Sequence, residues 1–132
     1  MFLLKLNKNE KKAFLQLAHY VARVDGNFGD EEKVVMQTYA YEMGIEDEGF
    51  KENEFNLDRT LESFETDEAK KIVLIEIMAL IYADNKVDEK EEEIIENICK
   101  KFTITRKKTM LYEEWTKAML ALYKQGELFL SV

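Results

Sequence analysis

The sequence has 132 residues, of which 46% are hydrophobic and 35% are charged, and its formal net charge is −8. This length and apolar content fit a single folded domain with its own core and exclude an intrinsically disordered chain. The acidic charge would repel phosphate backbones, so nucleic acid is excluded as the expected partner.

The chain favours helices throughout, because it contains no proline, only five glycines and none of the alternation typical of strands. Apolar residues recur at helical spacing, which predicts six helices in chain order: 9–24, 30–43, 58–64, 67–84, 89–102 and 105–125. An acidic, irregular stretch over 46–56 separates the second helix from the third. We therefore expect an all-α fold, a compact bundle of about six helices.

Capping residues mark several of the predicted helix ends. Thr66 is expected to be the N-cap of the fourth helix, and Asp88 with Glu91 three residues later forms a capping box for the fifth. Glycine tolerates the left-handed backbone that ends many helices. Three glycines are therefore predicted to stop the first, second and last helices: Gly26, Gly44 and Gly126.

An internal repeat organises the chain. Sliding the sequence by 59 residues places 11–45 on 70–104 without a gap, with six identical positions, and aligns the apolar stripes of the two capped helices. These stripes are Val35, Met36, Tyr39, Ala40 and Met43 in the first unit and Ile94, Ile95, Ile98, Cys99 and Phe102 in the second. One hairpin cannot bury its own apolar face, so we predict a single domain over 1–132 made from two pseudo-symmetric helical hairpins.

The longest apolar run covers 72–83 and is interrupted only by Glu76. Its twelve residues are too few to span a bilayer, which needs about 20, so the protein is not expected to be membrane-inserted. We predict instead a buried central helix. Glu76 is expected at the one solvated edge of that helix, and a buried carboxylate is the alternative.

Each hairpin turn carries an Asp where the first helix ends and a Glu seven residues later. These residues are Asp25 and Glu32 in the first turn and Asp84 and Glu91 in the second. Neither turn is an EF-hand loop, because both lack glycine at position 6 and Glu at position 12. Four carboxylates meeting near a twofold axis would suit Ca²⁺ or Mg²⁺. Turn bonding and helix capping explain the same residues without a metal.

The two turns resemble the signature of the TerB-like family, the helical domains of tellurite-resistance TerB and DjlA type. The matching residues are Val24-Asp25-Gly26, Phe28 and Glu32 in the first unit and Ala83-Asp84-Asn85, Val87 and Glu91 in the second. The sequence departs from the family at Asn85, which replaces a glycine, and at Gly29, which replaces a capping residue. The resemblance implies a non-catalytic module of tellurite-resistance and related stress systems, which acts near the membrane through partner proteins.

Isolated reactive side chains are interpreted as structural. Cys99 lies among apolar residues, which indicates a buried thiol, and a single cysteine excludes an internal disulfide and fits a cytoplasmic protein. His19 is expected to be a half-buried packing residue rather than a ligand. Five residues of the last helix are expected in the core: Met110, Leu111, Tyr112, Trp115 and Met119.

The expected function is a non-catalytic protein-interaction component of a bacterial stress system, because no phosphate loop, Cys/His cluster or nucleophile motif is found. Its partners would be other proteins, some of them membrane-associated. The alternative is a sensor or carrier of a divalent cation, Ca²⁺ or Mg²⁺, that uses the repeated Asp/Glu turns. The apolar tail either folds back or supplies a self-association patch, so a homodimer is one expected assembly: Leu128, Phe129, Leu130 and Val132.

Overall fold

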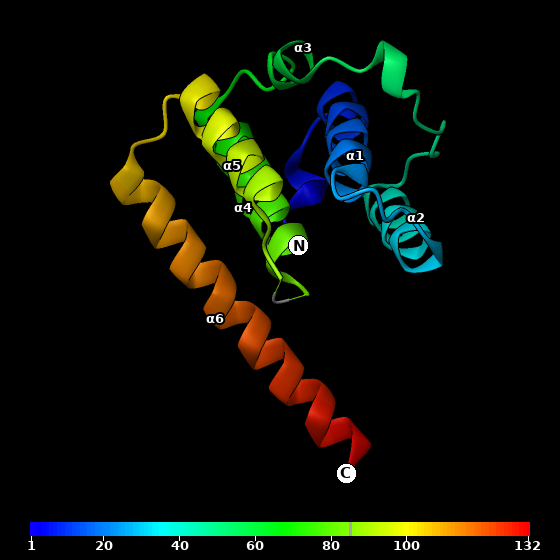
Figure 1. Ribbon diagram of the computed structural model, residues 1–132, viewed down its shortest axis with the longest axis vertical. Helices are drawn as coiled ribbons and strands as arrows, with labels where there is room; N and C mark the ends of the chain where they lie inside the picture. The colour runs from blue at the N-terminus through cyan, green and yellow to red at the C-terminus, as the bar shows by residue number, and fades with distance from the viewer. Residues whose placement is uncertain (85) are drawn as a thin grey trace.

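The computed structural model describes residues 1–84 and 86–132, and over these residues every regular element is a helix (Figure 1). Asn85, in the second predicted turn, lies outside the described residues. The α-helices are α1 (Lys8–Arg23), α2 (Asp30–Met43), α3 (Leu57–Leu61), α4 (Asp67–Tyr82), α5 (Glu89–Phe102) and α6 (Arg106–Ser131), and two short 3-10 helices are η1 (Leu3–Lys5) and η2 (Glu52–Glu54). The predicted all-α fold is confirmed. None of the helices in the described parts of the chain is long and apolar enough to cross a bilayer.

Local capping signals place most of the helix ends where the sequence predicts them. The Thr66 hydroxyl accepts a hydrogen bond from the Ala69 N–H at 3.1 Å, so Thr66 is the N-cap of α4. Asp88 and Glu91 form the predicted capping box, since each side chain accepts a hydrogen bond from the other's backbone N–H. Gly44 ends α2 with a left-handed φ of 67°.

The predicted stop at Gly126 is wrong, because α6 continues to Ser131. Gly126 does not adopt a left-handed φ, and a Cβ added there would meet nothing within 4 Å. Glycine inside a helix costs roughly 1 kcal/mol relative to alanine, but it does not by itself end the helix. The flanking residues, among them Glu127 and Leu128, are good helix formers and carry α6 through this position.

Helix α4 lies at the centre of the fold, where it packs against α1, α5, α6 and η1. Its side chains Val73, Leu74, Ile77 and Met78 are fully buried, as expected for the apolar run. The stripes of α2 and α5 contribute to the same core, with Met36, Ala40 and Met43 from one and Ile94, Ile95, Ile98 and Phe102 from the other. Both hairpins are therefore present, α1 against α2 and α4 against α5. Their relation by a twofold axis stays a prediction.

The expected position of Glu76 at a solvated edge is wrong, because its side chain is only 5% exposed. The backbone N–H of Phe2 donates a hydrogen bond to Glu76 Oε2 at 2.7 Å, and the N-terminal ammonium of Met1 lies 3.0 Å from the same oxygen. The segment that contains η1 covers this side of α4 and brings its own polar groups to the carboxylate. A buried carboxylate requires such partners.

The expected burial of the α6 side chains is correct only in part. Tyr112 and Met119 are half-buried, whereas Met110, Leu111 and Trp115 are exposed. The reason is that α6 makes its main contact with one helix, α4, and so buries only the face turned toward it. The C-terminal end of α6 extends past the other helices (Figure 1).

We predict that Glu76→Ala lowers the free energy of unfolding by about 2–3 kcal/mol, because it leaves the Phe2 N–H without its acceptor and removes a charge-assisted hydrogen bond. Urea unfolding measures this change. The exposed Glu93 on α5 supplies the matched control, and Glu93→Ala should stay within about 0.5 kcal/mol of the parent protein. Equal effects of the two substitutions would contradict the buried role of Glu76.

Candidate functional site

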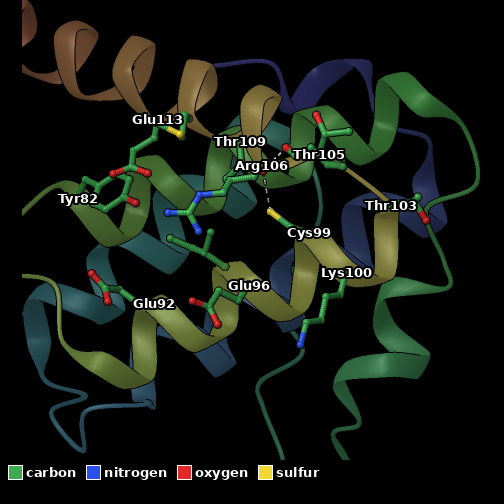
Figure 2. Close-up of a pocket in the computed structure, with 13 residues that line it drawn as sticks. Tyr82, Glu92, Glu96, Cys99, Lys100, Thr103, Thr105, Arg106, Thr109 and Glu113 are labelled. Carbon is green, nitrogen blue, oxygen red and sulfur yellow. Dashed lines mark hydrogen bonds between the residues drawn. The ribbon is translucent and has the colours of Figure 1, made fainter.

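A groove of about 630 Å³ lies between α5 and the first half of α6 (Figure 2). It forms because α5 and α6 both pack against α4, while the chain between them turns at Thr103–Thr105. Its apolar lining comes from both walls and includes Ile95 on α5 and Met110 on α6. The volume is within the range of about 300–1,000 Å³ that is usual for ligand pockets.

Both acidic and basic side chains line the groove. Glu92 and Glu96 follow each other by one turn along the α5 wall, and Glu113 lies opposite on α6. Lys100 and Arg106 lie nearer the connection between the two helices, and Figure 2 shows the Arg106 side chain pointing into the groove. The acidic end of the groove is the part lined by Glu92, Glu96 and Glu113, and the Arg106 guanidinium extends from the connection toward it (Figure 2).

Tyr82, near the end of α4, lies at the acidic end of the groove (Figure 2). Burial raises the pKa of its phenol, and the charges of Glu113 and Glu92 and a hydrogen bond to Glu113 raise it further. The phenol therefore stays protonated and can donate to Glu113. A second hollow of about 490 Å³ shares Tyr82 as a lining residue, and there the ammonium of Lys117 lies 4.8 Å from the centre of the Tyr82 ring.

Cys99 lines the groove and is half-buried, so the expected burial of its thiol is correct only in part. Burial raises the pKa of its thiol, against a hydrogen bond with the Thr109 hydroxyl that lowers it, and the charge of Glu96 raises it as well. The sulfur lies 3.2 Å from Thr109 Oγ1 (Figure 2). A neutral thiol bonded to a threonine hydroxyl is a weak nucleophile.

His19 is buried, and both of its ring nitrogens have partners. Nε2 lies 2.9 Å from an oxygen of Asp47, and the Arg23 guanidinium donates a hydrogen bond to Nδ1 at 2.7 Å. An arginine can only donate, so Nδ1 is the acceptor and the imidazole is the neutral tautomer with its proton on Nε2. With its acceptor nitrogen occupied, His19 is placed as a structural residue rather than as a general base.

The same arginine joins His19 to two aromatic rings. The guanidinium carbon of Arg23 lies 3.6 Å from the centre of the Phe28 ring and 4.8 Å from that of Phe50. Phe50 also stacks on the His19 ring at 5.8 Å. This cluster holds the turn after α1 and the irregular segment around Asp47 against α1. No pattern in the sequence singles out Arg23 or Asp47, although Arg23 lies one helical turn after His19.

In the first acidic turn, each of the two predicted site residues accepts a local backbone hydrogen bond. Asp25 Oδ1 accepts from the Asn27 N–H at 2.9 Å, which is an Asx turn. Glu32 Oε2 accepts from the Gly29 N–H at 3.0 Å, at the start of α2. Both bonds match the turn and capping interpretation of these residues.

In the second turn, Asp84 Oδ1 accepts from the Lys86 N–H at 3.0 Å, and Glu91 closes the capping box of α5. Burial raises the pKa of Glu91, and among the charges that raise it are those of Asp84 and, from the other turn, Asp25. The two turns are therefore within electrostatic reach of each other. Over 1–84 and 86–132, no three His, Cys, Asp or Glu side chains are grouped so that they could hold a metal ion.

Comparisons with known proteins find no matching protein family, no matching curated protein and no matching solved structure. The TerB-like resemblance rests on the motifs of the two turns alone.

Proposed function

We propose that this protein is a non-catalytic, TerB-like interaction module of a bacterial stress system, and that it binds a partner protein in the groove between α5 and α6. The observation that carries the proposal is the groove itself. Its walls, formed by α5 and α6, are apolar, and charged side chains line its rims. Grooves of this kind bind amphipathic helices, which bury an apolar face between the walls and direct polar residues to the rims.

The chemistry of the partner follows from the acidic end of the groove. Glu92, Glu96 and Glu113 provide three carboxylates around the protonated phenol of Tyr82. Lys or Arg side chains on a bound segment would pair with these carboxylates, and its apolar residues would contact Ile95 and Met110. A basic amphipathic segment is thus the best match. Such a segment is also common at the surfaces of membrane-associated proteins, which fits the expected setting.

A non-catalytic role is supported by the state of the two residues that most often carry catalysis. The Cys99 thiol is neutral, and its hydrogen-bond partner is the Thr109 hydroxyl, which is not a base that could activate it. His19 is held by Asp47 and Arg23 on both of its nitrogens and is not among the residues that line the groove.

To test the proposal, peptides of about four helical turns from a random phage-displayed library are selected on the immobilised protein. We expect the recovered peptides to carry apolar residues at helical spacing together with Lys or Arg, and to bind the protein measurably in calorimetry. In the variant with both Glu92→Lys and Glu96→Lys, affinity should fall at least about tenfold, which is about 1.4 kcal/mol.

The matched control reverses the charge of two exposed acidic residues of α2 that lie outside the groove, with the substitutions Glu31→Lys and Asp30→Lys. These substitutions change the net charge by the same amount as the groove variant. It should leave the affinity within about twofold. Equal loss in the control would mean that net charge alone attracts the peptides. Selected peptides without basic residues, or binding that the groove variant leaves unchanged, would contradict the proposal.

The divalent-cation sensor is the second candidate. The charges of Asp84 and Asp25 act on Glu91, although no three such side chains of the described residues are grouped so that they could hold an ion. A bound cation would relieve this repulsion and stabilise the folded protein by mass action. The candidate predicts that millimolar Ca²⁺ or Mg²⁺ raises the melting temperature and that Asp84→Asn abolishes the rise. An unchanged melting temperature with both ions would exclude it.

A further inference from the structure

A row of apolar side chains follows the outer face of α6 from Leu111 to the residue after its C-terminal end, Val132. The residues alternate at spacings of four and three, with Gln125 as the one polar member, and we call this row the outer stripe: Leu111, Trp115, Ala118, Leu122, Gln125, Phe129 and Val132. The exposed fractions of the large side chains are high, at 57% for Leu111, 67% for Leu122 and 77% for Phe129. Trp115 is 45% exposed, although the centres of the Phe2 and Trp115 rings are only 6.1 Å apart.

The outer stripe is separate from the two faces of α6 that already have a role. The face turned toward α4 carries Tyr112, Thr116 and Met119, and Thr116 is the buried residue of the helix. The groove is lined by Arg106, Met110 and Glu113 on another side. At 100° per residue, the centre of the outer stripe lies well over 90° from both of these faces.

We propose that the outer stripe is a homodimer interface, in which α6 of one copy pairs with α6 of a second copy. A spacing of four and three, which averages 3.5 residues, is the repeat of a coiled-coil seam and fits another helix with the same repeat. The second copy carries that repeat on the same exposed face. A twofold axis would therefore make the two stripes self-complementary.

The area of the outer stripe is close to the lower limit for a specific interface, which is about 1,000 Å² over both partners. Burial of one large apolar side chain removes on the order of 100 Å² from water. The five large members of the stripe would thus bury on the order of 500 Å² per copy, which is more than half of the roughly 800 Å² that each partner gives to a standard interface.

The charges on α6 favour an antiparallel pair. Its first turn is basic, with Arg106, Lys107 and Lys108, and a parallel pair would bring two such turns side by side. An antiparallel pair would separate them by nearly the length of the helix, about 39 Å for its 26 residues. This distance is several times the Debye length of about 8 Å at physiological salt, so the repulsion would be screened.

The proposed dimer goes beyond the groove function and does not depend on it. Because the groove and the outer stripe lie on different faces of α6, pairing would leave both grooves open. The dimer would then present two copies of the same groove, which would strengthen binding to a partner with two matching segments.

Sedimentation equilibrium of the full chain over a range of concentrations tests the proposal. We expect the mass to rise from 15.6 kDa toward twice that value as the concentration increases. Leu122→Glu and Phe129→Glu together should shift the dissociation constant upward by at least about 100-fold, because each buries a charge in the seam. Lys124→Glu, an exposed change on the same helix but outside the stripe, should leave it within about threefold.

Circular dichroism of the double variant must show retained helix, so that a monomer is not mistaken for an unfolded chain. A wild-type chain that stays at 15.6 kDa at every concentration would overturn the proposal, and the stripe would then belong to a different partner or a lipid surface. An equal effect of Lys124→Glu would overturn it as well. For the orientation, Lys107→Cys in a Cys99→Ser background should not form a disulfide-linked dimer on mild oxidation, and efficient crosslinking would show a parallel pair.

Discussion

The fold depends on the burial of α4. From Ile72 onward its side chains are apolar on nearly every side, so water must be excluded around most of this part of the helix. Helices α1, α5 and α6 and the short η1 segment each cover part of it. Phe2, just before η1, supplies the backbone N–H that hydrogen-bonds to Glu76, the one buried carboxylate of α4. Because each surrounding element packs where it covers part of α4, α5 and α6 both pack against this helix. The space between them forms the groove.

The same arrangement explains why α6 has faces available for partners. It is the longest helix of the described chain, yet Thr116 is its one fully buried residue, since α4 supports it on a single side. One flank of α6 becomes a wall of the groove, and its outer face carries the apolar stripe. The two proposed interfaces would thus have one structural cause. A long amphipathic helix packs mainly against one neighbour, and its other faces are exposed.

Local signals in the sequence predict much of the fold but little of the candidate site. Gly44, Thr66 and the Asp88/Glu91 capping box act within a few residues of the chain, so their positions can be predicted from the sequence. The burial of Glu76 and the exposure of Trp115 depend on which distant segment covers them, and helical periodicity carries no such information. The groove likewise joins Glu92, Tyr82 and Glu113 from three helices, and no spacing along the chain indicates that they meet.

Amide hydrogen exchange along α6, followed by mass spectrometry in dilute and concentrated protein, tests most directly whether this helix is held on one side only. We expect residues 109–120 to exchange slowly at both concentrations, because they pack on α4. Residues 121–131 should exchange rapidly in dilute protein and slow down in concentrated protein, where a second copy covers them. Equal, concentration-independent protection of both segments would contradict this view, because it would mean that a single copy already holds the whole helix.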